Sequence, residues 1–555
     1  MYIRYMRIRN YRSFSDIEIK FHHVANYLVG ENNIGKSGFL HLLGSVSSGA
    51  GVDEKDFRNP LLPVIITLDI NLLNNEKEFY EDTPDDRSSY IRVRLEQHIE
   101  DIYPRLFDDE SGAELPLHLV RHVRYIGHSA LYPEHDTVPT YVYRSLEEEL
   151  YAVLGENKPA IIGAAKAFIE HEEQISVYDS SYYINILLLS KLLGRQDRAR
   201  ADNVKFISLV ALHLLSRIYH MMNRQNVRTE QTVIVDGQGR RLLPLIISFD
   251  EPEIHLHPYM QRAVLDYIKR LLRNEEPAFS HILKKLFDLD GLRGQLIVVT
   301  HSTDSLVDDY RNIIRFYRNG KDEVCAACGA VAYFNGEIEK HLIMHFPEVK
   351  AALYSRSVII VEGETEYGCF GLFGKTMGIP FDYYGITLIN ARGESSIDKI
   401  RKLLQYFKIP TVSLYDADVK RLRRGEENTY FTEEICFEMD LVKTMLSCGK
   451  KRELNRIFDM VGGEHSRVTS DMLKKVCRKL DLDYHDYKPR LLCNVNPRNT
   501  AELELYYFAW MYSNKGVILG RYLGLYLQKD WIPPSFARVI KAAAEMAKDR
   551  NSVFF

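Results

Sequence analysis

The chain has 555 residues, of which 46% are hydrophobic and 27% are charged, and its formal net charge is −4. This length exceeds what one ordinary hydrophobic core organises and favours roughly two to four domains. The composition is that of a globular protein, and the slightly acidic balance excludes nucleic-acid binding through a global basic field.

The first nine residues alternate apolar and basic side chains, which predicts a strand and argues against a secretion signal. The longest apolar runs, such as 245–247 and 296–299, have the length of strands. None approaches the roughly 18 residues of a membrane span. Seven scattered cysteines, an odd number, do not form a disulfide framework. We therefore expect a cytoplasmic protein that does not cross a membrane.

A phosphate-binding loop occupies residues 30–37, which read Gly-Glu-Asn-Asn-Ile-Gly-Lys-Ser. It lies between a short apolar strand and a helix, the context in which such a loop wraps phosphates with backbone N–H groups. Lys36 is expected to reach the β- and γ-phosphates of ATP, and Ser37 to ligate Mg²⁺. The predicted nucleotide-binding residues of the loop are Gly30, Asn32, Asn33, Gly35, Lys36 and Ser37.

The next two segments differ in their apolar spacing. Residues 76–145 are polar and are expected to be irregular, whereas residues 146–235 show helical spacing. We interpret the latter segment as a helical insertion in a nucleotide-binding domain. Its apolar face either forms a dimer or packs against its own domain.

Two later strands complete the predicted nucleotide site. The apolar run 245–249 ends at Asp250, which is expected to hold Mg²⁺ as well. The next residue, Glu251, is placed to polarise the attacking water, so we assign it both a catalytic and a nucleotide-binding role. A third apolar strand, 296–299, is followed by His301, a candidate contact for the γ-phosphate.

A second α/β domain is predicted from residue 349. Apolar strands at 357–361, 386–390 and 411–415 alternate with helical segments, which favours a parallel sheet covered by helices on both faces. After residue 430 the pattern is mostly helical. The expected domains are 1–145 and 236–348 for the two parts of the ATPase, 146–235 for the insertion, and 349–555 for the second domain with its C-terminal helices.

Carboxylates follow two of these strands directly. Glu362 and Glu366 are one helical turn apart, while Asp416 and Asp418 follow the strand 411–415. The ends of adjacent parallel strands meet in one crevice, where clustered acids are tolerable only with bound cations. Oxygen ligands suit Mg²⁺ or Mn²⁺, and two such ions can hydrolyse a phosphodiester. Glu364 is expected to point elsewhere.

The first half of the chain resembles the ABC-type ATPases, in the branch of SMC and RecF-like proteins. Residues 8–14 are similar to the first strand of that group, and residues 250–258 to its Walker B segment and following loop. Such ATPases complete each other's sites with a signature sequence. Residues 201–205, at the expected place, depart from it, which puts dimer-dependent hydrolysis in doubt.

The second half resembles the Toprim domain, whose marks are Glu-Gly after one strand and Asp-x-Asp after a later one. An ATPase followed by Toprim is the arrangement of the OLD (overcoming lysogenization defect) family of nucleases. That family includes the nuclease of the Gabija defence system and retron-associated effectors. The resemblance implies a further metal ligand at Glu438, with Glu434 as the alternative, and an active-site lysine at Lys515.

The fold class expected is therefore α/β, an ABC-type ATPase domain followed by a Toprim domain. The expected function is an ATP-regulated endonuclease in anti-phage defence that uses Mg²⁺ or Mn²⁺, with metal ligands Glu362, Glu366, Asp416, Asp418, Glu438, Ser37 and Asp250. Its expected partners are DNA, further copies of the chain, and a defence-system protein or a retron RNA–DNA. An ATP-switched DNA sensor and a Toprim RNase are the alternatives. Topoisomerase and primase functions fit less well, because no tyrosine-nucleophile motif marks the 35 tyrosines and a primase would not carry this ATPase.

Overall fold

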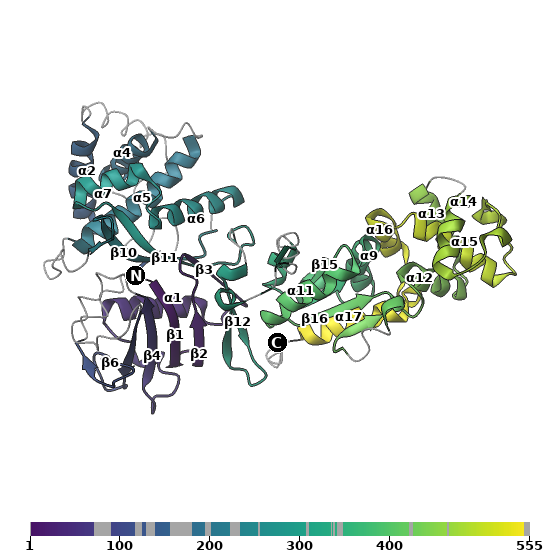
Figure 1. Ribbon diagram of the computed structural model, residues 1–555, viewed down its shortest axis with the longest axis horizontal. Helices are drawn as coiled ribbons and strands as arrows, with labels where there is room; N and C mark the ends of the chain where they lie inside the picture. The colour runs from purple at the N-terminus through teal and green to yellow at the C-terminus, as the bar shows by residue number, and fades with distance from the viewer. Residues whose placement is uncertain are drawn as a thin grey trace. The chain divides into compact units, whose positions relative to one another are not determined.

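The computed structural model describes residues 2–71, 90–116, 125–128, 139–155, 180–194, 201–222, 233–253, 256–306, 310–332, 348–420, 426–462 and 466–548, with a few single residues between 333 and 347. The chain divides into two compact units, residues 1–332 and 333–555, whose elements are shown in Figure 1. The junction precedes the boundary at residues 348–349 that the sequence suggested. Both units mix helices with sheets, as predicted.

The first unit begins with an antiparallel sheet. Within the described residues its strand order is β2-β1-β4-β5-β6-β7. The strands are β1 (Tyr2–Tyr11), β2 (Phe14–Lys20), β4 (Val64–Asn71), β5 (Tyr90–Gln97), β6 (Arg105–Asp108) and β7 (Glu114–Leu115). The expectation that residues 76–145 are irregular is wrong for β5 to β8 and for the start of α2 at Thr140. In β5 every second residue is buried, so its charged side chains lie on the outer face of a regular strand.

The second sheet of this unit is mostly parallel and carries the predicted nucleotide site. Its described strands have the order β13-β12-β3-β11-β10-β8, with β9 beside β10. They are β3 (Ala25–Val29), β8 (Tyr125–His128), β9 (Ile234–Val235), β10 (Arg241–Asp250), β11 (Gly291–Val299), β12 (Ile313–Arg318) and β13 (Val324–Cys328). Strand β11 lies between β3 and β10 and is parallel to both. The loops after them therefore leave from the same edge of the sheet.

Some helices of this unit pack against this sheet, and others pack mainly against one another. The helices are α1 (Lys36–Ser48), α2 (Thr140–Leu154), α4 (Ser180–Gly194), α5 (Ala201–Met222), α6 (Pro258–Leu272) and α7 (Pro277–Phe287). Within the predicted insertion, α4 packs against α5, and α2 packs against α4 (Figure 1). Leu188, Leu189 and Leu215 are fully buried in this packing. Much of the apolar side of these helices is thus buried within the unit itself.

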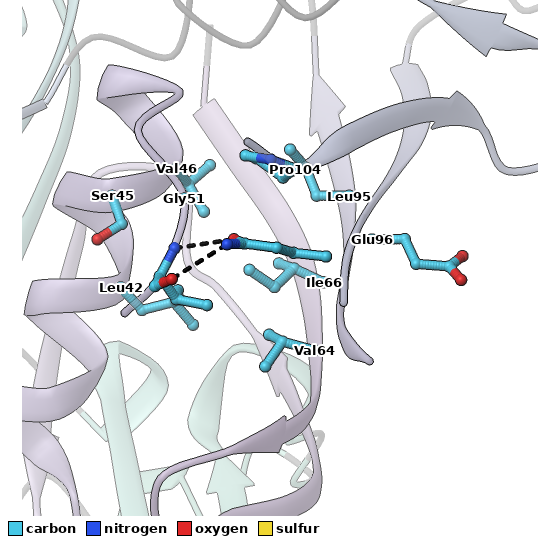
Figure 2. A pocket seen from close by; sticks show the side chains of 11 residues that line it. Leu42, Ser45, Val46, Gly51, Val64, Ile66, Leu95, Glu96 and Pro104 are labelled. Atoms are coloured by element: carbon cyan, nitrogen blue, oxygen red, sulfur yellow. Dashed lines mark hydrogen bonds between the residues drawn. The ribbon is translucent and has the colours of Figure 1, made fainter. Parts of the chain in front are cut away.

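The antiparallel sheet also closes over α1. Gln97 at the end of β5 accepts a hydrogen bond from the Val52 backbone N–H (2.9 Å) and donates one to the Val52 carbonyl (3.1 Å). Figure 2 shows the small pocket beside this pair, lined mainly by apolar side chains such as Leu42 and Ile66. Its volume of about 20 Å³ admits little more than a water molecule. The pair therefore fixes the segment after α1, and the pocket offers no room for a ligand.

The second unit contains a parallel sheet with the described strand order β15-β14-β16-β17. The strands are β14 (Ser357–Val361), β15 (Ile386–Asn390), β16 (Thr411–Tyr415) and β17 (Thr429–Phe431). The first three have the bounds predicted from their apolar runs. Every residue of β14 and β16 is buried, which explains why these runs are continuously apolar and do not alternate.

Helices provide the rest of the second unit. They are α9 (Glu364–Thr376), α10 (Phe381–Tyr384), α11 (Glu394–Tyr406), α12 (Phe437–Ser447), α13 (Lys451–Gly462), α14 (Ser470–Leu480), α15 (Thr500–Ser513), α16 (Val517–Tyr526) and α17 (Pro534–Ala547), with a small hairpin of β18 (Arg467–Val468) and β19 (Arg490–Leu491). The segment after residue 430 is mostly helical, as predicted. No helix among the described residues combines the length and apolarity that crossing a bilayer requires.

An aromatic cluster joins α9, α12 and α17 beneath the sheet. The Phe536 ring stacks on Phe437 with a centroid distance of 4.4 Å and lies 5.7 Å from the Phe370 ring. All three side chains are buried. Because α9 and α12 both carry predicted metal ligands, this cluster fixes the position of the elements that form the site.

Replacing Phe536 with alanine is expected to destabilise the protein by about 3–5 kcal/mol, because the cavity forms where three helices meet. Urea denaturation followed by a spectroscopic signal of the second unit measures this loss. Tyr383→Ala is the control, since the Tyr383 side chain is 83% exposed. A cost below about 1 kcal/mol for Phe536→Ala would contradict the assigned packing.

Candidate nucleotide and metal sites

The phosphate-binding loop connects β3 to α1, as predicted. Gly30 has φ 144° and Gly35 has φ 108°, values that side chains with a Cβ rarely adopt. An added Cβ on Gly30 would lie 2.5 Å from the Phe316 carbonyl oxygen of β12. Both glycines are therefore required by the close approach of the loop to its own domain. Asn33, between them, also has a positive φ of 57°.

Lys36 lies inside this loop and bonds to its backbone. The Lys36 Nζ donates hydrogen bonds to the carbonyls of Gly30 (2.9 Å) and Glu31 (2.7 Å). Burial lowers the pKa of this amine to about 8, and the nearby Glu251 and Asp250 oppose that change. The Lys36 amine is thus held inside the loop by two neutral carbonyls, and a negatively charged phosphate bound there would interact with it more strongly.

Asp250 ends β10 beside the loop, where the sequence predicted a Mg²⁺ ligand. The Ser37 hydroxyl hydrogen-bonds to its carboxylate, while burial raises the Asp250 pKa. One carboxylate oxygen, Oδ1, is buried and has no hydrogen-bond partner among the described residues. A buried acceptor without a donor is costly, and a hard cation would satisfy it. Ser37 and Asp250 therefore fit a Mg²⁺ ion held together with nucleotide phosphates.

Glu251 and His301 meet beside Asp250. The His301 Nε2 lies 3.6 Å from the Glu251 Oε1, and burial lowers the pKa of the imidazole. Glu253 fixes the loop after β11, because its carboxylate accepts hydrogen bonds from the Thr300 hydroxyl (2.8 Å) and the His301 backbone N–H (2.6 Å). The three strand ends thus bring Lys36, Asp250, Glu251 and His301 together, the set that the sequence assigned to nucleotide.

Sequence reasoning did not assign Arg12 to this site. Arg12 lies in the turn between β1 and β2 with φ 46°, and its guanidinium pairs with the buried Asp56 at 2.7 Å. Its side chain passes close to Gly38 in the first turn of α1. The segment 8–14 was recognised only as a strand. The signal that marks Arg12 is its position in a short turn, which becomes informative only once β1 is placed beside the loop.

The four acids at the strand ends of the second unit are brought to the same sheet edge. Glu362 follows β14, and Glu366 is in the first turn of α9 with its side chain 7% exposed. A Cβ on Gly363 would lie 2.8 Å from the Glu366 Oε2, so the glycine leaves room for the Glu366 carboxylate in its present position. Asp416 follows β16 and accepts a hydrogen bond from the Phe437 backbone N–H (3.1 Å). Asp418 lies two residues further, in a short 3₁₀ turn.

These acids raise one another's pKa values. Burial and the neighbouring Glu362 and Glu438 raise the pKa of Asp416 to about 7. Burial and Glu438 raise that of Glu366 well above its usual range. The pKa of Glu362 is raised by burial, by Glu394 and by Asp418. Such a cluster holds its negative charge only at an energetic cost unless a cation neutralises it.

The donor set fits Mg²⁺ or Mn²⁺ chemically, since it consists of carboxylate oxygens, the ligands that these hard cations prefer. The side chains are not already converged, however: no group of three or more His, Cys, Asp or Glu within the described part of the chain surrounds a single metal position. A bound cation would have to draw the carboxylates together.

Of the two alternatives, Glu434 before α12 and Glu438 within it, Glu438 is the one near the other acids. Its side chain is 5% exposed in the first turn of α12, and its charge raises the pKa of both Glu366 and Asp416. The Glu434 carboxylate instead pairs with the Lys443 Nζ at 2.8 Å. The arrangement therefore favours Glu438 as a ligand.

Lys515 approaches the acids through a close crossing of α9 and α16. The Gly516 backbone N–H donates to the Thr365 Oγ1 (2.9 Å), and a Cβ on Gly520 would lie 2.1 Å from the Thr365 carbonyl oxygen. Burial works to lower the Lys515 pKa, but Glu438, Tyr512 and Glu366 raise it. A cation and the predicted metal ligands thus share one site, built from segments about 150 residues apart.

Comparison with known families agrees with this arrangement. Residues 353–418 match the model of the overcoming lysogenization defect protein-like Toprim domain. Residues 1–179 match an AAA ATPase domain, and residues 238–308 match an AAA domain described as a putative AbiEii toxin of a type IV toxin–antitoxin system. The chain belongs to the OLD family of ATPase–Toprim proteins. The ATPase domain implies ATP binding.

Solved structures cover each half of this OLD-family chain. The C-terminal region of the Xanthomonas campestris pv. campestris OLD protein is 18% identical, with 35% of this chain and 96% of that one covered and a TM-score of 0.25. The C-terminal region of the Burkholderia pseudomallei OLD protein is 17% identical, with 35% of this chain and 99% of that one covered and a TM-score of 0.24. An SMC head bound to the C-winged helix domain of ScpA is 12% identical, with 59% and 98% covered and a TM-score of 0.29. No curated protein matches the sequence significantly.

Two further groups of this OLD-family site were not assigned from the sequence. Glu394, in the first turn of α11, acts on the pKa of Glu362. Lys479 of α14 lies with its Nζ 3.6 Å from the Asp418 Oδ2. Lys479 belongs to a basic helix that the sequence shows, but its position beside Asp418 depends on how α14 packs. The sequence also has a run of basic residues from Lys420 to Arg424 after the second pair of acids, but residues 421–424 lie outside the described residues.

The crossing of α9 and α16 generates a test. Gly520→Ala is expected to destabilise the protein, because the new methyl group would meet the Thr365 backbone and push α16 away from α9. Gly371→Ala on α9 is the matched control. No atom lies within 4 Å of the added Cβ there, so a stabilisation of roughly 0.5–1 kcal/mol is expected. Equal stability of the two variants in thermal unfolding would refute the crossing.

The raised pKa of Asp416 predicts a pH-dependent cost. The protonated carboxyl is favoured in the folded state, so metal-free protein should lose stability as pH rises from about 4 towards the folded value of about 7. Asp416→Asn should therefore be more stable than the natural protein at pH 8 without metal, by at most ~4 kcal/mol. Thermal unfolding in EDTA at pH 5 and pH 8 measures this. Added Mn²⁺ should stabilise the natural protein more than the variant, and a variant less stable at pH 8 would contradict the assignment.

Proposed function

We propose that this OLD-family protein is an ATP-regulated, divalent-metal-dependent DNA endonuclease. One observation carries the proposal: Lys515 lies beside the buried acids Glu366 and Glu438 and the half-buried Asp416, at the carboxyl edge of a parallel sheet. Mutually repelling acids with a cation beside them suit an anionic substrate that is held through metal ions. A purely structural ion pair would not require an excess of buried carboxylates.

Glu362, Glu366, Asp416, Asp418 and Glu438 would hold the metal ions. When bound, two Mg²⁺ or Mn²⁺ ions would supply an activated water and neutralise the leaving oxygen of a phosphodiester. Lys515 would stabilise the charge that builds up on the scissile phosphate, because its amine stays protonated among the acids. The Phe437 N–H keeps Asp416 oriented before the substrate arrives.

The ATPase unit is proposed to control cleavage through its nucleotide state. Lys36, Ser37, Asp250 and His301 would bind the phosphates and Mg²⁺, and Glu251 would polarise the water that attacks ATP. ATP-dependent pairing of two or more copies of the chain would assemble the active nuclease. A role in anti-phage defence, with a partner protein or a retron RNA–DNA, follows from the family resemblance.

A supercoiled-plasmid cleavage assay with Mg²⁺ or Mn²⁺, with and without ATP, tests the proposal. Glu362→Gln is expected to reduce cleavage at least 100-fold, because a predicted metal ligand is lost, whereas Glu364→Gln should leave it unchanged. Glu364 is exposed and serves as the matched control. Lys36→Ala should abolish the difference between the lanes with and without ATP.

The remaining outcomes distinguish the alternatives. DNA binding without cleavage by the natural protein, under every metal and nucleotide condition, would favour an ATP-switched DNA sensor. Cleavage of RNA but not of DNA under the same conditions would identify a Toprim RNase. Full activity of Glu362→Gln would overturn the assignment of the nuclease site.

A further inference from the structure

Three lysines of the second unit surround one aromatic ring. The Nζ atoms of Lys515, Lys475 and Lys479 lie 4.7, 5.0 and 5.4 Å from the centroid of the Tyr512 ring. Because they share this centroid, any two of the amines are at most about 10 Å apart, roughly one Debye length at 0.1 M salt. Their positive charges therefore act on one another and on any anion beside the ring.

Local structure places these side chains together. Lys475 and Lys479 are four residues apart on α14, so they project from the same face of that helix. α14 packs against α15, which carries Tyr512 near its end, and Lys515 follows three residues later (Figure 1). The ring holds the cations by cation–π attraction, each contact contributing roughly 0.5–1 kcal/mol at exposed positions.

Few acids neutralise this cluster. Among the described residues the only ion pair of these three amines joins the Lys479 Nζ to the Asp418 Oδ2, at the long distance of 3.6 Å. Like charges four residues apart on a helix are destabilising, so Lys475 beside Lys479 on one face of α14 carries a cost that the single long pair with Asp418 offsets only in part. An anion bound beside Tyr512 would remove that cost.

The cluster adjoins the predicted metal site. Lys479 pairs with Asp418, and Lys515 acts on Glu438 and Glu366, so two of the three amines adjoin the acids. Lys475 lies one helical turn away from Lys479 on α14. The upper limit of about 10 Å on the distance between any two amines leaves room for each to contact a different phosphate of one strand, whose rise is about 3.4 Å per nucleotide. A chain of phosphates that crosses the metal ligands would continue over these lysines.

We propose that Lys475 and Lys479, together with Lys515, bind the phosphodiester backbone next to the bond that is cut, with Tyr512 holding the three amines in place. This inference rests on the proposed nuclease function and names the residues that hold its substrate. Contacts of this kind recognise the charge of the backbone and not the base sequence.

Equilibrium binding of a fluorescent duplex DNA, with Ca²⁺ replacing Mg²⁺ so that no cleavage occurs, tests the inference. The double variant Lys475→Gln with Lys479→Gln is expected to raise the Kd about 10- to 100-fold. The slope of log K against log salt should become shallower by about 2, since about one counterion is released per phosphate contact. Lys479→Arg combined with native Lys475 should retain binding, because the charge is kept.

The matched control is Lys474→Gln with Arg478→Gln, which removes two positive charges from the same helix. Both side chains are exposed, and the Lys474 amine faces the Tyr484 ring, 5.4 Å from its centroid. This control should change the Kd less than 3-fold and leave the slope unaltered. Equal effects of the two double variants would overturn the inference, because they would indicate general attraction by net charge.

Two further comparisons separate this inference from the proposed function. If the natural protein cleaves plasmid and the Lys475/Lys479 variant binds and cleaves like the control, the inference fails while the nuclease function stands. If the natural protein neither binds nor cleaves nucleic acid, the proposed function fails as well. An RNA strand of the same sequence should lose affinity in parallel with DNA, and a loss confined to RNA would refute backbone binding during DNA cleavage.

Discussion

Repulsion among buried carboxylates is the constraint on which the second unit depends. Glu362, Glu366 and Asp416 each have a raised pKa, because each is wholly or partly desolvated beside other acids. A fold selected only for stability would place apolar or paired groups there. The aromatic cluster around Phe536 and the glycine contacts between α9 and α16 supply the packing that keeps these acids together. Stability elsewhere in the unit thus offsets the electrostatic cost at the site.

The nucleotide site follows the same logic with the opposite charge. Lys36 is desolvated inside a loop of backbone groups, and two carbonyls partly compensate for the water that it has lost. The carboxylate of the nearby Asp250 retains an oxygen to which no group among the described residues donates a hydrogen bond. Both sites therefore contain polar or charged groups that the protein itself satisfies only in part. Ligand binding at each site would supply the missing interaction.

Much of the fold could be predicted from the sequence, because local patterns determine it. The strands that end at Val361, Asn390 and Tyr415 are continuous apolar runs, and the loop before Lys36 is a motif whose glycines are required by its backbone angles. Strand β5 was missed because its outward residues are charged, which hides a period of two in a polar segment. The positions of Arg12 and Lys479 could not be predicted, since each depends on the packing of elements distant in sequence.

The crossing of α9 and α16 has a consequence for how the protein can change over evolution. Gly368 lacks room for a side chain because the Val517 carbonyl faces it, and Gly520 lacks room because of the Thr365 carbonyl. A substitution at either position would widen the separation of the two helices, and a second substitution could not restore it. The distance between Glu366 and Lys515 therefore cannot change in small steps through substitutions at these two glycines. Insertions in the long segment between them would leave it intact, provided that the two helices still meet.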